Sequence, residues 1–133
     1  MSENKPLLGL LLSDDLIFTS RITGTARALG LMVKPGCSVE ELETLARQQP
    51  PTGVLVDLGN PGLDVPDLIA RLKAVCSMMP RVVAYGSHVD AAGLRAARAA
   101  GCDIVLPRSA FVEQLPKSLP EWLSINEEDE RPA

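Results

Sequence analysis

The feature that most constrains the fold is a regular alternation of short apolar runs with longer amphipathic segments. The apolar runs, which we interpret as strands, are Leu7–Leu12, Leu31–Lys34, Gly53–Val56, Arg81–Tyr85 and Asp103–Leu106. Several of them are continuous runs of Val, Leu and Ile, which is typical of strands that are buried on both faces of a parallel sheet. The alternation therefore predicts a chain of strand–helix units.

Helix start and stop residues divide the segments between these runs. The expected helices lie at about 18–29, 39–49, 65–76 and 90–100. Ser38 is placed to cap the second helix, with Glu41 in the capping-box position, and Asp64 marks the start of the third. Gly30 and Gly101 are the expected stops of the first and fourth helices.

The last amphipathic segment is less regular. A fifth helix is expected to begin near Ala110, but Pro116 and Pro120 follow within ten residues. Because proline removes a helical hydrogen bond and its ring clashes with the preceding turn, we expect this helix to be short or broken.

Five strand–helix units in this order predict a flavodoxin-like, doubly wound α/β fold, (βα)5. The expected parallel five-stranded sheet has the order 2-1-3-4-5 with helices on both faces. A chain of 133 residues has the size of one domain. We assign this domain to residues 1–125 and expect the acidic tail, residues 126–133, to fray.

Charge and composition exclude several function classes. A net charge of −4 argues against a broad surface for nucleic acid or anionic membranes. The apolar run at the amino end is too short for a membrane span or a signal-peptide core, so a cytoplasmic protein is expected. Cys37, Cys76 and Cys102 are far apart, without the spacing of a zinc site or a disulfide framework. No catalytic triad or glycine-rich nucleotide loop is present, so we do not expect an enzyme.

Acidic residues follow the two strands that flank the expected switch point of the sheet. Asp14 and Asp15 follow the first strand, and Asp57 follows the third. In this strand order, ligands bind at the carboxyl ends of those two strands, so the three carboxylates are expected to converge there. Repulsion between them is relieved by a hard divalent cation, for which Mg2+ fits best. A carboxylate beside such a cation can act as a nucleophile and form an acyl phosphate.

A simpler interpretation is that acids at strand ends cap helices or face the solvent. It holds well for any single residue. It is weaker here because two separate strand ends deliver acids to the same switch point.

The sequence resembles the response-regulator receiver family over nearly the whole chain, up to about Leu119. The stretches that carry the resemblance are Leu10–Asp15, Val54–Gly62, Arg81–Ser87 and Ala96–Asp103. The second has the family's proline four residues after the aspartate, and the last ends in Ala-Gly-Cys-Asp. Each is a weak indication alone, but together they stand in the family's order and spacing.

The resemblance implies a stand-alone receiver-like protein in phosphorelay, or two-component, signal transduction. It implies that Asp57 is the phosphoacceptor and that Asp14 and Asp15 bind Mg2+ together with Asp57. The backbone carbonyl of Gly59 would complete the protein ligands of the metal. A sensor histidine kinase, a phosphotransfer protein or another signalling protein is the implied partner, and a homodimer is a further expectation.

Other family positions differ and make this an atypical or degenerate receiver. Gly86 stands where the family has a Thr or Ser whose hydroxyl binds the phosphoryl oxygen. The next residue, Ser87, supplies a hydroxyl only if a local bulge turns it inward. Arg108 stands at the position of the phosphate-binding lysine and is followed by Ser109 instead of proline. The family's switch aromatic falls on Val105.

Two alternative functions remain open from the sequence. The altered residues favour a pseudo-receiver that serves as a protein–protein interaction module without phosphorylation. A small flavin or nucleotide binder on the same fold is more remote, because residues 13–20 carry two acids and bulky apolar side chains where a phosphate loop would lie.

Overall fold

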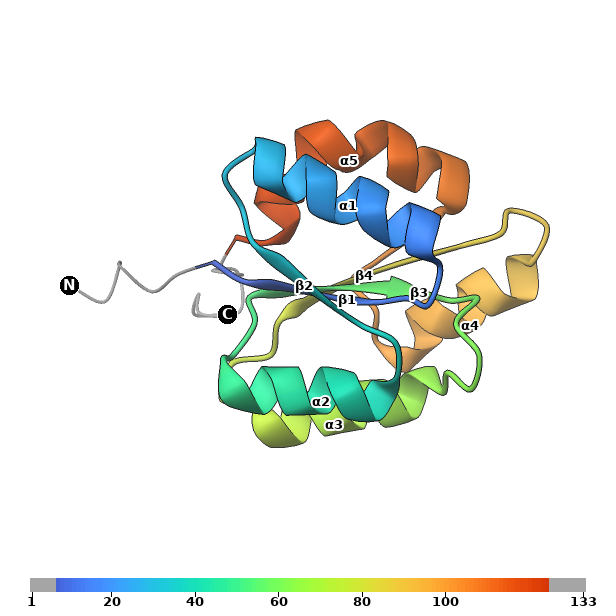
Figure 1. Ribbon diagram of the computed structural model, residues 1–133. Coiled ribbons are helices and arrows are strands. Elements are labelled where there is room, and N and C mark those ends of the chain that lie inside the picture. The colour runs from blue at the N-terminus through green and yellow to red at the C-terminus, as the bar shows by residue number, and fades with distance from the viewer. Residues whose placement is uncertain (1–6, 125–133) are drawn as a thin grey trace, which may run out of the picture.

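A computed structural model describes residues 7–124 of the chain, in which five strands alternate with five helices (Figure 1). The elements are β1 (Gly9–Leu12), α1 (Leu16–Ala28), β2 (Val33–Gly36), α2 (Val39–Gln48), β3 (Gly53–Asp57), α3 (Val65–Val75), β4 (Arg81–Gly86), α4 (Ala91–Ala100), β5 (Ile104–Pro107) and α5 (Arg108–Trp122). The acidic tail predicted at residues 126–133 lies outside the described residues.

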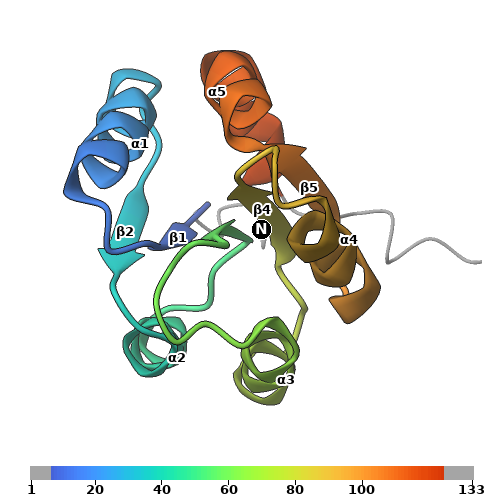
Figure 2. The same cartoon turned by 90° about the vertical axis from the view of Figure 1, so that its right-hand side faces the viewer.

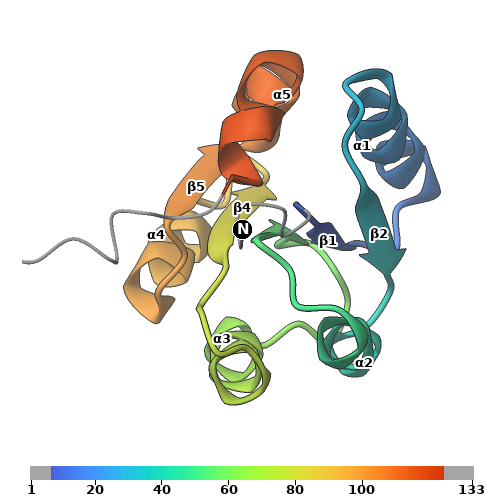
Figure 3. The same ribbon diagram turned by 90° about the vertical axis from the view of Figure 1, so that its left-hand side faces the viewer.

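The strands form one parallel sheet in the order β2-β1-β3-β4-β5, which confirms the predicted fold class. Helices α1 and α5 cover one face, and α2, α3 and α4 cover the other, as the two end views show (Figures 2 and 3). Because β1 and β3 are neighbours while β2 lies outside β1, the switch point falls between β1 and β3. In this register Leu12 pairs with Val56, and Asp57 pairs with Tyr85.

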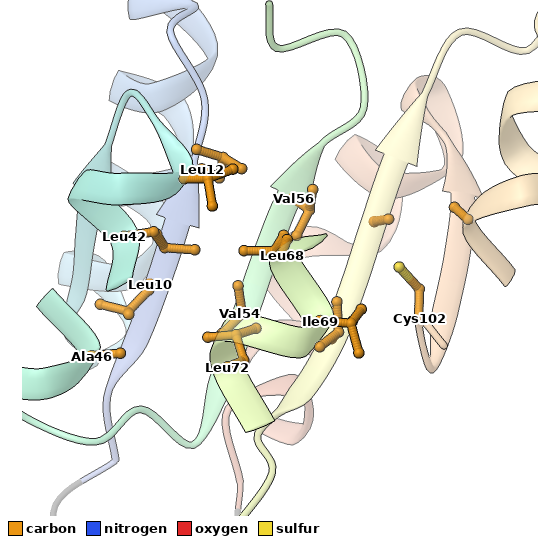
Figure 4. Packing of buried hydrophobic residues seen from close by; sticks show 14 of the residues in the cluster. Leu10, Leu12, Leu42, Ala46, Val54, Val56, Leu68, Ile69, Leu72 and Cys102 are labelled. Carbon is orange, nitrogen blue, oxygen red and sulfur yellow. The ribbon is translucent and has the colours of Figure 1, made fainter. Parts of the chain in front are cut away.

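Alternation along the strands divides the core into two layers. The layer beneath α2, α3 and α4 is aliphatic (Figure 4). Its strand residues include Leu10, Leu12, Val54 and Val56, and each of these side chains is fully buried. Burying a side chain of this size stabilises the fold by about 1.5–3 kcal/mol before entropy is counted.

The layer beneath α1 and α5 holds all four aromatic side chains of the chain. Tyr85 on β4 stacks on Phe111 of α5 at 4.3 Å between ring centroids, and Phe111 stacks on Trp122 at 5.3 Å. Phe18 of α1 lies 5.0 Å from the Tyr85 ring and 6.2 Å from the Phe111 ring, so the three rings form one cluster. With so few aromatics in the chain, this stack fixes α1 and α5 against the sheet.

The predicted helix starts at Ser38 and Asp64 are confirmed, and α1 begins at Leu16, two residues before its predicted start. Asp15, Ser38, Asp64 and Asp90 each accept a hydrogen bond from a backbone N–H in the first turn of α1, α2, α3 and α4. The capping box of α2 differs in one detail, because the Glu41 carboxylate accepts from the backbone N–H of the residue before Ser38.

The prediction that the last helix is short or broken is wrong. Helix α5 runs without interruption over 15 residues and contains both Pro116 and Pro120. Both prolines are exposed, so their rings stand toward the solvent and disturb no core contact. The helix loses backbone hydrogen bonds at these two positions, but its buried stripe holds it on the sheet. That stripe consists of Phe111, Leu115, Leu119 and Trp122.

Thr52, just before β3, joins the two described ends of the chain. Its hydroxyl accepts a hydrogen bond from the N–H of Leu8 and also contacts the carbonyl oxygen of Leu123. Gly53 packs so closely beneath this end of α5 that a Cβ there would lie 2.6 Å from the Trp122 carbonyl oxygen. Among residues 7–124, no helix is long and apolar enough to cross a membrane.

Candidate functional site

Asp57 is the buried charged residue at the carboxyl end of β3. Its side chain alternates with Val56 and so lies on the same face of the sheet as Leu55, beneath α1 and α5. Only 4% of Asp57 is exposed. A carboxylate with so little access to water needs hydrogen-bond donors from the protein.

Two groups donate hydrogen bonds to the Asp57 carboxylate, and a cation lies near it. The Ser13 hydroxyl donates to Oδ2 at 3.0 Å, and the backbone N–H of Gly59 donates to Oδ1 at 2.9 Å. The Arg108 guanidinium lies 3.7 Å from Oδ1. Both carboxylate oxygens are thereby contacted, which supports a charged side chain in a buried position.

Ser13 is a site residue that the sequence analysis missed. It follows β1 directly and alternates with Leu12, so its side chain enters the same layer as that of Leu11. Ser13 is 2% exposed, and its oxygen also accepts from the backbone N–H of Asp15 at 3.1 Å. The indication was present in the sequence, because the alternation of the strand extends by one residue beyond the last leucine.

Asp14 and Asp15 are both exposed. The Asp15 carboxylate accepts from the backbone N–H of Phe18 at 3.0 Å and caps α1, which is the simpler interpretation weighed for these acids. Within residues 7–124, the structure contains no group of three or more His, Cys, Asp or Glu side chains that could hold a metal ion. The arrangement described here therefore does not fit the ligand set predicted from Asp14, Asp15, Asp57 and Gly59, and metal binding by these residues stays a prediction.

Arg108 begins α5, directly after the trans proline that ends β5. Its guanidinium lies 5.6 Å from the centre of the Phe18 ring while it faces Asp57. The side chain is 44% exposed, so the ion pair is screened by water, and its free energy is smaller than that of a buried pair. Arg108, which stands where the receiver family has a lysine, thus brings a positive charge to the Asp57 carboxylate.

The other altered positions point away from Asp57. A Cβ on Gly86 would lie 3.3 Å from the Leu58 side chain, on the α4 side of the sheet. The Ser87 oxygen accepts from the backbone N–H of Val89 at 3.3 Å, within the turn before α4. Val105 is buried in the aliphatic layer on the opposite face. The structure therefore does not bring Ser87 to Asp57.

Tyr85 is the second site residue that the sequence analysis missed. It is fully buried, pairs with Asp57 in the sheet register and faces the same layer. Its hydroxyl is one of the buried polar atoms in the described part of the chain that lack a hydrogen-bond partner; the other is the Asn60 side-chain oxygen. Burial raises the pKa of Tyr85, and the charge of Asp57 raises it further, while the nearby Ser13 hydroxyl and Arg108 lower it.

Comparison with solved structures identifies the fold. A response regulator from Chloroflexus aurantiacus matches with a TM-score of 0.73 and 21% identity, covering 90% of this chain and 98% of that one. The receiver domain of Ssk1 from Saccharomyces cerevisiae, solved with the histidine phosphotransfer protein Ypd1, gives 0.74 and 16% identity and covers 90% of each chain. The receiver domain of a Pseudomonas aeruginosa sensor histidine kinase, described with a magnesium ion coordinated in its active-site cleft, gives 0.73 and 19% and covers 89% of this chain and 98% of that one.

These likenesses show that the chain has the fold of response-regulator receiver domains. No protein-family profile and no curated protein matches the sequence. The identities are low enough that the shared fold, and not a shared site chemistry, is what the structures have in common with this chain.

Proposed function

We propose that this chain, which has the fold of response-regulator receiver domains, is an atypical receiver in cytoplasmic two-component signalling. The observation that carries the proposal is the buried Asp57 carboxylate, which lies at the switch point and has a cation and a hydroxyl group beside it. In an open α/β sheet this is the position at which ligands bind. Three free cysteines agree with a reducing compartment.

The chemistry that we propose for Asp57 is transfer of a phosphoryl group to its carboxylate. A carboxylate oxygen attacks phosphorus, an O–P bond forms, and the bond from phosphorus to the donor breaks, leaving its electron pair on the donor. The product is an acyl phosphate. Arg108 is placed to bind an oxygen of the transferred group, and the Gly59 N–H and Ser13 hydroxyl hold the carboxylate in position.

Mg2+ is part of the expectation from the receiver fold. Of the four predicted ligand residues, only Asp57 is a buried carboxylate here, and the Asp15 side chain is engaged as a helix cap. The described arrangement thus fits Mg2+ poorly. Titration with Mg2+ tests whether Asp14, Asp15, Asp57 and the Gly59 carbonyl bind the ion.

Exposed apolar side chains near Asp57 offer a contact surface to a partner that delivers the phosphoryl group. Leu16 and Ile17, in the first turn of α1, are 80% and 81% exposed. Exposed apolar side chains of this size next to a reactive site are typical of a protein contact surface. A histidine phosphotransfer protein or a sensor histidine kinase is the partner we propose, in line with the solved complex of the Ssk1 receiver domain with Ypd1.

One observation favours the alternative of a pseudo-receiver that binds a partner without phosphorylation. The two oxygens of Asp57 are already contacted by Ser13, Gly59 and Arg108. A carboxylate held in this way can fix the surrounding loops in one arrangement, so that a partner binds the same surface at all times. Structures of the protein with and without beryllofluoride distinguish the two functions, because unchanged geometry of α4 and β5 supports the pseudo-receiver.

The direct test is incubation with Mg2+ and a small phosphodonor such as acetyl phosphate, followed by mass spectrometry of the intact protein. We expect one added phosphoryl group on the wild-type protein and none on Asp57→Asn, which keeps the shape of the side chain. Omitting Mg2+ shows whether the reaction needs the ion. Repeated absence of the adduct on the folded wild-type protein would contradict phosphorylation and leave the pseudo-receiver.

A further inference from the structure

We propose that Tyr85 is a hydroxyl donor at the Asp57 site, and that its O–H binds an oxygen of a tetrahedral oxyanion held there. The proposal deepens the function given above and rests on it for the identity of that oxyanion, a phosphoryl group. It assigns the role to a residue one position before Gly86, on the other face of β4.

The sheet places Tyr85 beside Asp57. The two residues are partners in the parallel register of β3 and β4, and their side chains enter the layer beneath α1 and α5. Ser13 enters the same layer from β1, and Arg108 reaches it from the start of α5. Four side chains from four segments therefore meet on one face at the carboxyl edge of the sheet. The Tyr85 hydroxyl is near enough to Asp57, Ser13 and Arg108 for each to affect its pKa.

The Tyr85 hydroxyl has hydrogen-bonding capacity that the protein leaves unused. The residue is fully buried, and its oxygen has no partner. An unsatisfied buried hydroxyl is unfavourable, and such groups in folded proteins commonly have a functional reason. An oxyanion next to Asp57 would supply the missing acceptor.

The other donors of the site surround the Asp57 carboxylate. The Gly59 N–H, the Ser13 hydroxyl and the Arg108 guanidinium are arranged around the oxygens of Asp57. With the Tyr85 hydroxyl they make a set of donors with one cation, which suits a tetrahedral anion once the carboxylate is esterified or removed. Ser87 is not part of this set, because its oxygen is engaged with the Val89 N–H.

The aromatic stack holds the donor in a fixed place. The Tyr85 ring packs on Phe111 at 4.3 Å and on Phe18 at 5.0 Å, and these two rings also contact each other at 6.2 Å, so little rotation of the Tyr85 ring is available in this three-ring cluster. A donor positioned in advance binds without the loss of side-chain entropy that a mobile group incurs. The same stack continues to Trp122, the only tryptophan of the chain.

The test uses inorganic phosphate and the full-length variant Asp57→Ala, in which no carboxylate competes with an anion for the donors. We expect phosphate to bind and to change the fluorescence of Trp122, with the dissociation constant confirmed by calorimetry at constant ionic strength. Adding Tyr85→Phe should weaken binding by about tenfold, the effect of losing one hydrogen bond to a charged group. Ser87→Ala in the same background is the matched control and should leave the constant unchanged.

Two outcomes would overturn the proposal: no phosphate binding by folded Asp57→Ala, or equal affinity with and without the Tyr85 hydroxyl. Cooperative thermal unfolding of each variant shows that it is folded, and Asp57→Asn serves as the background if Asp57→Ala does not fold. The result is independent of the phosphodonor experiment. Phosphate binding that needs Tyr85, in a protein whose Asp57 accepts no phosphoryl group, would refute the phosphoacceptor function and keep this site.

Discussion

At the scale of single residues, the two hydroxyl groups beside Asp57 differ in their hydrogen bonding. The Ser13 hydroxyl donates to Asp57, and its oxygen accepts from the Asp15 N–H. The Tyr85 oxygen is equally inaccessible to water and has no partner. Removing the two hydroxyls should therefore change the stability of the protein in opposite directions.

Tyr85→Phe should stabilise the ligand-free protein. The substitution keeps the ring in its stack and removes only a buried oxygen that makes no hydrogen bond. We expect the free energy of unfolding to rise by about 1 kcal/mol, the lower end of the cost of an unsatisfied buried group. Urea denaturation measures the change, and a fall in stability would show that the hydroxyl is bonded in solution.

Ser13→Ala should destabilise the protein by about 1–3 kcal/mol, because a buried, charged oxygen of Asp57 loses its donor. The same denaturation experiment applies. Ser87→Ala provides the matched control: its oxygen bonds only an exposed turn, and we expect a change within about 0.5 kcal/mol. If both serine variants were equally stable, the Ser13–Asp57 hydrogen bond would contribute nothing to folding.

At the scale of elements, α5 shows that the effect of a proline depends on the face of the helix where it lies. Pro116 and Pro120 are one turn apart on exposed positions, whereas the buried stripe begins at Phe111 and ends at Trp122. The rule that proline breaks helices describes the backbone alone. Packing of the apolar stripe outweighs the lost hydrogen bonds.

Pro116→Ala should therefore stabilise the protein. The new N–H can bond the carbonyl of Val112 one turn earlier, and no buried contact is lost because the ring is exposed. The gain in the helix, less the greater freedom of the unfolded chain, is about 2 kcal/mol in the free energy of unfolding. Pro66→Ala is the control, because Pro66 lies in the first turn of α3, where an N–H has no helical partner. Equal effects of the two substitutions would contradict this explanation.

Most elements could be predicted from the sequence, and the reasons for the exceptions are physical. Continuous apolar runs and cap residues gave all five strands, the sheet order and the first four helices to within a few residues. The position of Asp57 could be predicted because the sheet order places the carboxyl end of the third strand next to that of the first. The alternation of β1 indicates that Ser13 faces the same layer as Leu11, but the sequence pattern does not specify its hydrogen bond to Asp57. The pattern also does not decide whether Asp15 caps α1 or turns toward Asp57, because that depends on the packing of the loop. Tyr85 resembles any other core residue until its hydroxyl is seen without a partner.

At the scale of the whole molecule, the ionisation of Tyr85 is linked to unfolding at high pH. The pKa of Tyr85 is raised in the folded state, whereas an unfolded chain has a tyrosine pKa of about 10. The free energy of unfolding is therefore unaffected by this ionisation below pH ~10, and it falls as the pH rises above ~10, by up to about 1.4 kcal/mol per pH unit, because the unfolded state loses the tyrosine proton first.

Denaturation between pH 9 and 12 should show this loss in the wild-type protein, and Tyr85→Phe should lack it. Because the chain has a single tyrosine, the absorbance of tyrosinate should appear together with unfolding and not before it. Lysines and buried thiols contribute equally to both proteins and cancel in the comparison. Tyrosinate formation in the folded state would contradict the described burial.

The hydroxyl of Thr52, which contacts residues at both described ends of the chain, has a practical consequence for how the molecule can be handled. Leu8 and Leu123 meet beside Thr52, at the end of the sheet where β1 and β3 begin, and Asp57 is the last residue of β3 at the opposite end. A surface tether, a fluorescent reporter or a second copy attached beside Leu8 or Leu123 would therefore be joined at the end of the sheet opposite Asp57. The same closeness makes the domain suitable for insertion, as one unit, into a loop of a host protein.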